Sequence, residues 1–240
     1  LVNNNNKDQD QNNLKFIELI KDEYVVKNGK WIISKDLIIP DSKKLIILPG
    51  TELILTNNAQ IISKSPIIAK GTKENKILIK GLPFEQINND QKNNIKYKNK
   101  NSGQCILIIN AKETSIFENT EFDNLRNCDK DLIISEGSLN VYKSNIIMKN
   151  VVFKNNKSGD DGINFINSEF ELKNIEFKNI YADGLDLDYS FGKIDNFSCT
   201  NCANDGIDIS NTTLVLKNYK ASQIQDKAIS IGENSIINGT

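Results

Sequence analysis

The stretch ADGLDLDYSFGKIDNFSCTNCANDGIDIS (182–210) contains one short pattern twice, and the chain around it repeats that pattern further. Asp-Gly pairs begin at Asp161, Asp183 and Asp205, and a related Asp-Lys-Ala triplet begins at Asp226, at spacings of 22, 22 and 21 residues (183−161, 205−183, 226−205). A fixed period of this size is the signature of stacked supersecondary units. The sequence therefore predicts a solenoid in which each unit buries its apolar residues against its neighbours.

A second row of residues repeats with a similar period. The segments NTEFDN, NVVFKN, NIEFKN and NFSCTN are variants of one pattern, and each of them and one further segment opens with an asparagine: Asn119, Asn150, Asn174, Asn196 and Asn218. Stacked asparagines at a solenoid corner bond their side-chain amides to one another and to the turn backbone. We therefore expect this row to be structural and to need no ligand.

Short apolar runs separated by turn residues fill the chain from Trp31 onward. The runs WIIS, DLIIP, KLIILPG, TELILT, QIIS, PIIAKG and KILIKG have the β-branched composition and the Pro and Gly punctuation that are typical of strands. Later repeats contain three such runs each. The sequence thus predicts an all-β fold, a single-stranded right-handed parallel β-helix of about ten coils, in which equivalent residues stack about 4.8 Å apart.

The domain organisation follows from where this rhythm begins and breaks. We expect residues 1–13 to be a disordered polar lead-in, residues 14–240 to form one β-helix domain, and the lysine-rich stretch 82–102 to be a loop excursion from it. Residues 14–27 mix apolar and charged side chains behind Asn13, which predicts a short amphipathic helix capping the N-terminal end.

The last repeat, which starts at Asp226, is shorter than a full period. A strand edge left without a partner tends to pair with other chains. We therefore expect either end-to-end self-association or continuation of the native chain past residue 240.

Composition excludes several classes of function. The chain has 30 basic and 31 acidic residues and no histidine, and its sole arginine is Arg126. This balance predicts no nucleic-acid partner, and the missing histidine excludes histidine-based triads and metal sites. No apolar run is long enough to insert into a membrane. We expect an extracellular or cell-surface location, although no leader is visible.

Four cysteines are present, and two of them form the pattern Cys199-Thr200-Asn201-Cys202. No second such pair and no histidine complete a zinc site. Cys199 takes the place that phenylalanine holds in the related segments, which favours thiols packed in the core; a local disulfide is the alternative.

Alternation along the strands assigns their side chains to two sides. We expect the apolar residues after each Asp-Gly pair to point inward and the polar residues between them to point outward. For the aspartates that open the strands, ordinary turn chemistry is one explanation: the aspartate bonds backbone two residues on and the glycine takes a positive φ. The outward residues form one row of Asn164, Asp186, Asp208 and Ser230, and a second of Asp188 and Ser210.

Turn chemistry does not explain Asp186, Asp188 and Asp208, because aspartate is depleted within strands. Carboxylates about 4.8 Å apart repel by about 0.9 kcal/mol in water and about 3.5 kcal/mol at an effective permittivity near 20. One carboxyl can act as general acid on a glycosidic bond while its neighbour acts as nucleophile or base. Otherwise the face is solvated and either binds sugar hydroxyls or only keeps the molecule soluble. A third explanation is a calcium ion, whose oxygen ligands would be Asp161, Asp183, Asp186, Asp205 and Asp208.

At these residues the chain resembles the right-handed parallel β-helix superfamily of carbohydrate-active proteins, over roughly residues 31–240. ADGLDLDYS, NDGIDIS and DKAISIGENS are similar to the three consecutive coils that carry the active site of polygalacturonases. The resemblance implies Asp183 and Asp205 as catalytic aspartates, with Lys227 in the place of the family histidine. Ala182 and Asn204 replace a family threonine and a family aspartate, and the family's Arg-Ile-Lys motif is missing.

Polysaccharide lyases of the same superfamily resemble the chain in another way, since they combine calcium-binding aspartates with a lysine or arginine base. That resemblance implies Lys227 as the base. Its pKa would have to lie several units below about 10.4, whereas nearby carboxylates raise it.

Together these observations predict a secreted or cell-surface β-helix that binds polysaccharide through its acidic strand face and is non-catalytic or vestigial. One alternative is a glycoside hydrolase or polysaccharide lyase, and another is a structural or adhesive segment of a longer surface protein. The alternative enzyme would use Asp183, Asp205, Asp208 and Lys227. The expected sugar-binding residues are Asn164, Asp186, Asp188, Tyr189, Ser210 and Ser230.

Overall fold

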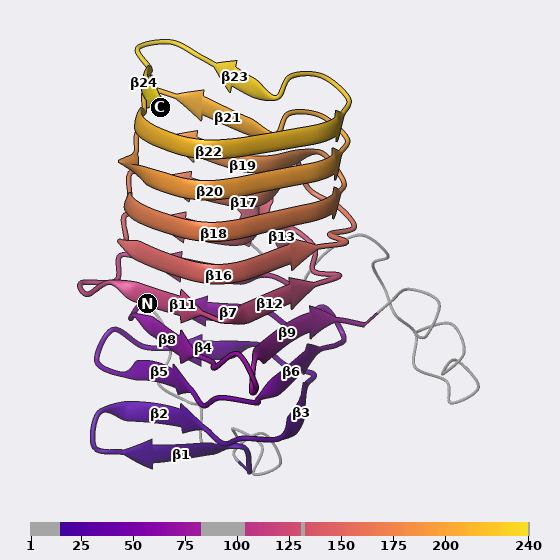
Figure 1. The fold of residues 1–240 in the computed structure, drawn as a ribbon. Helices are drawn as coiled ribbons and strands as arrows, with labels where there is room; N and C mark the ends of the chain where they lie inside the picture. The colour runs from indigo at the N-terminus through magenta and orange to yellow at the C-terminus, as the bar shows by residue number, and fades with distance from the viewer. Residues whose placement is uncertain (1–14, 83–103, 131–132, 240) are drawn as a thin grey trace.

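The computed structural model describes residues 15–82, 104–130 and 133–239, and within these ranges the chain is an all-β parallel solenoid without helices. Figure 1 shows the coils stacked from the N-terminal end at the bottom to the C-terminal end at the top. Two sheets form the walls, one of 14 strands and one of 8 strands. The predicted fold class is therefore confirmed.

The eight-stranded sheet carries one strand from each coil, so the described chain has about eight coils and the expected ten is wrong. Coils with excursions use more residues than the regular period of 22: Ile61 pairs with Ile106, and Ile106 pairs with Leu139. The strands of this sheet are β4 (Leu37–Ile39), β7 (Ile61–Ser63), β10 (Ile106–Ile109), β15 (Gly137–Tyr142), β17 (Asp161–Ile166), β19 (Asp183–Asp188), β21 (Ile207–Ser210) and β23 (Ile229–Ile231).

The 14-stranded sheet forms the opposite wall, and its three strands of 12 residues lie between residues 169 and 224. All seven runs that the sequence indicated between residues 31 and 81 are strands. The members of this sheet are β1 (Ile17–Ile20), β2 (Glu23–Val26), β3 (Lys30–Ile33), β5 (Lys44–Ile47), β6 (Glu52–Leu55), β8 (Ile67–Lys70), β9 (Ile77–Gly81), β11 (Ser115–Glu118), β12 (Thr120–Asp123), β16 (Ile146–Lys154), β18 (Glu169–Ile180), β20 (Phe191–Cys202), β22 (Thr213–Ile224) and β24 (Ile236–Gly239).

The asparagine row lies inside the long strands of this sheet, where the second and third runs of each coil join into one strand. Asn174 has a φ of 54° in the middle of β18, a left-handed conformation that asparagine tolerates better than most residues. Its side-chain amide donates to Asn150 at 2.8 Å and accepts from Asn196 at 2.9 Å. The predicted structural ladder is confirmed from Asn119 to Asn196, whereas Asn218 donates to Asp195 at 3.1 Å instead of to Asn196. A second ladder, from Asn155 to Asn201, runs beside it.

A hairpin covers the N-terminal end, and the amphipathic helix predicted there is wrong. β1 and β2 pair antiparallel, and β2 pairs parallel with β5 of the next coil. Phe16, which is 4% exposed, packs with its ring centroid 6.0 Å from that of Trp31. A strand satisfies the backbone N–H and C=O groups along the edge of β5, which a helix would leave without partners.

The four cysteines form two disulfides, so the expectation of free thiols in the core is wrong. Cys199 and Cys202 close the local pair, and Cys199 does stack on Phe177 as the repeat alignment predicted. Cys105 and Cys128 are 23 residues apart, and the folding of one coil brings their Cα atoms to 5.3 Å. Two disulfides are typical of proteins that fold outside the cytoplasm.

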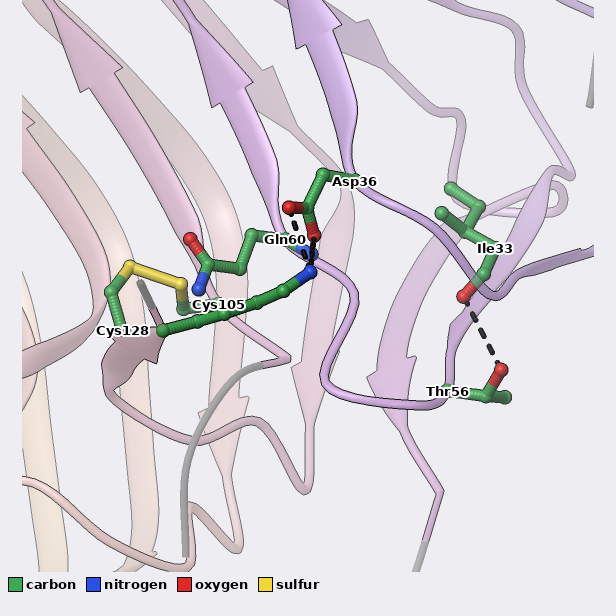
Figure 2. A network of polar contacts seen from close by, with 7 residues as sticks. Ile33, Asp36, Thr56, Gln60, Cys105 and Cys128 are labelled. Carbon is green, nitrogen blue, oxygen red and sulfur yellow. Dashed lines mark hydrogen bonds and ion pairs between the residues drawn. A yellow bond between two sulfur atoms is a disulfide. The ribbon is translucent and has the colours of Figure 1, made fainter. Parts of the chain in front are cut away.

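The Cys105–Cys128 disulfide fastens a small hairpin, β13 (Cys128–Lys130) with β14 (Ile133–Ser135), to the wall of the solenoid. Figure 2 shows it beside Gln60, with Asp36 on the other side of that glutamine. Lys130 at the end of β13 also attaches this hairpin to the wall, through an ion pair with Asp36, Nζ to Oδ1 at 2.7 Å.

Some predictions lie outside the described residues, namely the disordered lead-in 1–13 and all of the excursion 82–102 except residue 82. The single domain 14–240, self-association and continuation past residue 240 stay predictions. Nothing in the described ranges forms a helix that could cross a membrane.

Candidate functional site

The strand register confirms the predicted rows of the acidic strand face, by which we mean Asn164, Asp186, Asp188, Asp208, Ser210 and Ser230. Asn164 pairs with Asp186, Asp186 with Asp208, and Asp208 with Ser230. Asp188 pairs with Ser210 in the second row. The apolar residues between them lie inside: Ile163, Leu185, Leu187, Ile207 and Ile209 are each 0% exposed.

The aspartates that open the strands are buried and bind the neighbouring coil. Asp183 is 6% exposed and Asp205 is 3% exposed. The backbone N–H of Asp205 donates to Asp183 Oδ1 at 2.6 Å, and that of Lys227 donates to Asp205 Oδ1 at 2.7 Å. The interpretation of these aspartates as turn residues that bond backbone two residues on is therefore wrong. Their partners are 22 residues away.

The glycines after these aspartates are also explained by the neighbouring coil. Gly162, Gly184 and Gly206 do not have a positive φ, so the predicted turn geometry is wrong for them. A Cβ on Gly184 would lie 2.5 Å from the carbonyl oxygen of Gly206, and one on Gly162 would lie 2.8 Å from that of Gly184. Glycine is needed here because the coils approach closely.

Lys227 occupies the aspartate position of its coil, whereas the sequence alignment had placed it at the glycine position. Ile207 pairs with Ile229, and the N–H of Gly206 donates to the carbonyl of Lys227 at 2.9 Å. Lys227 is thus 22 residues after Asp205 in the same row. Its Nζ lies 3.9 Å from Asp205 Oδ2 and 2.5 Å from Asp226 Oδ2.

An amide holds two of the carboxyl groups together. Nδ2 of Asn164 donates to Asp161 at 2.8 Å and to Asp186 at 2.9 Å. Burial, with smaller contributions from neighbouring carboxylates, raises the pKa of Asp161 to about 8 and that of Asp186 to about 9. Both groups are therefore mainly protonated at neutral pH, and each has an O–H that can donate a hydrogen bond.

A second group of carboxyls lies next along the axis. One carboxylate oxygen from each of Asp183, Asp205 and Asp208 lies within 4.8 Å of the others, and this group of three could hold a metal ion. Burial raises the pKa of Asp183 to about 6 and also raises that of Asp188. Of the five residues expected to bind calcium, Asp161 and Asp186 belong to the asparagine-bridged pair and not to this group.

The basic residue of the site stays protonated. The hydrogen bond that Lys227 Nζ donates to Asp226 raises the pKa of Lys227 above its ordinary value, and the charges of Asp205 and Asp208 act in the same direction. A protonated ammonium cannot remove a proton from a sugar carbon. The lyase alternative therefore has no base in Lys227.

Sequence reasoning missed two aromatic residues beside this face. The hydroxyl of Tyr219 donates to the carbonyl of Ala228 at 2.6 Å, close to Gly206, and burial raises its pKa to about 12. Phe191 is 55% exposed at the start of β20, only two residues after Tyr189, which is 64% exposed. The sequence did contain a signal for Phe191, because the equivalent residues of the neighbouring repeats are the polar Glu169 and Thr213.

Comparison with known proteins adds little to this geometry. No family model and no curated protein sequence matches the chain. Among solved structures, the chain is similar to WceF of Pantoea stewartii, described as a glycan biofilm modifying enzyme with a bacteriophage tailspike-like parallel β-helix fold. The TM-score is 0.41 at 10% sequence identity, and the match covers 91% of this chain and 32% of that one. This chain therefore spans about a third of the length of WceF, and the likeness concerns the fold alone.

Proposed function

We propose that this protein is a secreted or cell-surface solenoid that binds polysaccharide through the acidic strand face without cleaving it. The observation that carries the proposal is the in-register row of half-buried polar side chains Asp186, Asp188, Asp208 and Ser210, in which the buried amide of Asn164 holds the carboxyl of Asp186 in place. It fixes donors and acceptors in a row on a rigid sheet, and fixed polar groups of both kinds match the hydroxyls of a sugar chain.

The geometry argues against hydrolysis as the main activity. Inverting glycosidases place their carboxyls about 6.5–9.5 Å apart to leave room for a water molecule. The carboxylate oxygens of Asp183, Asp205 and Asp208 lie within 4.8 Å of one another, which leaves less room. Two of these groups also accept hydrogen bonds from backbone N–H groups, at Asp205 and Lys227. Their first role is to join coils.

Hydrolysis with retention of configuration remains the second candidate function, because two carboxyl groups of the acidic site have different pKa values. The pKa of Asp186 is about 9 and that of Asp183 about 6, a combination that suits a proton donor beside an ionised partner. Release of reducing ends from the bound polymer, lost in Asp186→Asn, would establish this second candidate.

The binding proposal is tested by measuring affinity for soluble β-glucan, galactomannan, xylan, polygalacturonate and alginate. We expect the wild-type protein to retain at least one of these polymers in affinity electrophoresis. Asp186→Asn and Asp208→Asn should each weaken that affinity about tenfold, which corresponds to about 1.4 kcal/mol. Glu176→Gln, on the opposite sheet, is the matched control and should bind as the wild type does. Binding of none of the polymers by the wild-type protein would refute the proposal.

Calcium is a further part of the proposal, at Asp183, Asp205 and Asp208. Asp183 and Asp205 each accept a backbone N–H through Oδ1, and one oxygen from each of the three carboxylates lies within 4.8 Å of the others. Ca²⁺ would complete its shell of 6–8 oxygens with waters and sugar hydroxyls. Calcium should raise the melting temperature of the wild-type protein in a saturable way, and Asp208→Asn should abolish the shift. Equal shifts in both proteins would exclude this site.

A further inference from the structure

One corner of the solenoid is a row of left-handed residues in which a tyrosine replaces the usual asparagine. The strand register and the backbone hydrogen bonds place these residues one above another, coil by coil, with φ between 47° and 54°. A bulky aromatic residue is an outlier in this conformation. The row consists of Asn110, Lys143, Asn167, Tyr189, Asn211 and Asn234.

Tyr189 cannot make the side-chain amide hydrogen bond that asparagines make in this row. Nδ2 of Asn234 donates to Oδ1 of Asn211 at 3.2 Å, an amide-to-amide contact that a tyrosine does not continue. The tyrosine side chain is 64% exposed, so it also contributes little to the core. A residue that breaks a local rule without a packing gain is best explained by function.

A second exposed aromatic residue lies two positions further on. Phe191, which is 55% exposed, stands in register between Glu169 and Thr213, where the neighbouring coils present polar side chains. Among the described residues, the aromatic side chains with this degree of exposure are Tyr181, Tyr189 and Phe191, and all three belong to the coil that contains β19. The concentration in one coil is not expected from packing.

The backbone between the two rings is held firmly. Ser190 is 3% exposed, and its Oγ accepts the N–H of Ser168 at 3.1 Å and donates to the carbonyl of Asp188 at 2.8 Å. Its own N–H donates to Oγ1 of Thr212 at 3.1 Å. Tyr189 and Phe191 are therefore presented by a fixed backbone, which reduces the entropy lost when a ligand binds.

Phe191 also forms one wall of a groove with a volume of about 440 Å³. This volume is within the range of sites for small ligands. The groove mixes apolar and polar groups, and Glu171 and Lys193 within it form an ion pair at 3.1 Å. Its other walls include Asn145, Ile147, Glu169, Thr213 and Val215.

The chemistry of this surface selects its ligand. An anionic polymer is disfavoured, because the acidic residue Asp188 directly precedes the tyrosine and Glu169 lies beside the phenylalanine. A sugar ring has a face of C–H groups for an aromatic ring and a rim of hydroxyls for the polar walls. The corner is also continuous with the acidic strand face, since Tyr189 directly follows Asp188.

We propose that Tyr189 and Phe191 form an aromatic subsite, at the corner between β19 and β20, that stacks on a neutral sugar unit of the bound polysaccharide. The subsite rests on the proposed function, because it extends the binding surface from the acidic strand face around the corner. It implies that the sugar chain lies across the coil of β19 rather than along the solenoid axis.

The test replaces each aromatic residue by the residue at the same position of the following coil. Tyr189→Asn copies Asn211, and Phe191→Thr copies Thr213. Both residues are already accommodated in this register, so both variants should fold. Each is expected to weaken binding of the neutral polymer that the wild-type protein retains, among β-glucan, galactomannan and xylan, by about tenfold. Tyr181→Ala, which removes an equally exposed tyrosine elsewhere in the coil, is the control and should bind normally.

The outcomes separate this subsite from the acidic strand face. Wild-type affinity in both aromatic variants, with binding lost in Asp186→Asn, would overturn the subsite and leave the proposed function intact. Weakened binding in the aromatic variants together with normal binding in Asp186→Asn would support the subsite and move the proposed binding surface away from the carboxyls. If the wild-type protein retains none of the neutral polymers, the neutral-sugar subsite is refuted; retention of polygalacturonate or alginate would still support the proposed function.

Discussion

At the scale of single residues, the position of a side chain in the stack decides its chemistry. Asp186 and Asp195 are both aspartates on strands, yet Asp186 lies between Asn164 and Asp208 on the acidic strand face, whereas Asp195 lies on an exposed part of the opposite sheet. Burial and the neighbouring carboxylates raise the pKa of Asp186 to about 9. Besides burial, the charges that raise this pKa belong to Asp161 and Asp208 in the neighbouring coils as well as to Asp188 and Asp183 in the same strand.

This shift predicts how stability depends on pH. An aspartate has an ordinary pKa near 3.8, and Asp186 in the folded protein keeps its proton up to about pH 9. Between these values the folded state binds more protons than the unfolded state, so stability falls as pH rises through this window and levels off above it. Asp186→Asn removes the ionisable group and still offers an amide oxygen to Asn164. Its free energy of unfolding should therefore fall less between about pH 5 and pH 9 than that of the wild type.

Urea unfolding at several pH values measures this slope. Glu176→Gln, which removes an exposed carboxylate on the opposite sheet, should leave the wild-type slope unchanged and serves as the control. Parallel profiles for the wild type and Asp186→Asn would mean that Asp186 is ionised in the folded protein at neutral pH. Asp161 would then be the next carboxyl to test, because Asn164 binds it in the same way.

Sequence alone could assign sides but not partners at this scale. The alternation of Leu185, Asp186 and Leu187 fixed which residues point outward, because the period of a strand is two. It could not reveal that Asp183 accepts the N–H of Asp205, since the same Asp-Gly pair is also ordinary turn chemistry. Only the closeness of adjacent coils distinguishes the two explanations.

At the scale of elements, the described coils are joined by ladders that run along the axis. Phe153, Phe177 and Phe197 stack in the core, with ring centroids 5.6 and 5.1 Å apart from one to the next. The asparagine ladder stands beside them in the wall of β16, β18 and β20. Each ladder joins a coil to both neighbours, so the contribution of one member depends on the coil above and the coil below.

The asparagine ladder can be tested at its centre. Asn174→Ala removes two amide hydrogen bonds and places alanine in a left-handed conformation, and should lower the free energy of unfolding by about 2–3 kcal/mol. Asn174→Gly removes the same bonds but accepts the conformation, and should cost about 1 kcal/mol less than alanine. Thermal and urea unfolding of both variants separate the two effects. Equal losses would show that the backbone conformation is not a source of strain.

The boundaries of strands could be predicted where the local sequence pattern determines them. They could not be predicted where pairing with a distant strand determines them. The runs from residues 31 to 81 were all recognised as strands because their apolar residues and turn signals are adjacent in sequence. The hairpin of β1 and β2 was mistaken for a helix, because Leu19 and Ile20 fit either pattern and the deciding partner is β5. Excursions made the number of coils unpredictable, because their length hides the period.

At the scale of the whole molecule, the acidic strand face lies on the smaller sheet near the C-terminal end, as the labels of β17, β19 and β21 show in Figure 1. The described coils nearer the N-terminus contribute the hairpin cover, the Cys105–Cys128 disulfide and the ion pair of Asp36 with Lys130 (Figure 2). The two ends of the solenoid thus carry different features. Each part contains one covalent link, because the other disulfide, Cys199–Cys202, lies at the end of β20, which follows the carboxyl groups of β19.

The disulfides give the last prediction. Closing a loop of 23 residues should stabilise the fold by about 3 kcal/mol, and closing one of 3 residues by about 2 kcal/mol, because the longer loop restricts the unfolded chain more. Cys105→Ala with Cys128→Ala should therefore lower the melting temperature more than Cys199→Ala with Cys202→Ala. Thiol titration of the unfolded wild-type protein should detect free thiols only after reduction, since all four cysteines are paired. Free thiols before reduction would contradict the pairing, and equal losses in the two variants would contradict the argument from loop length.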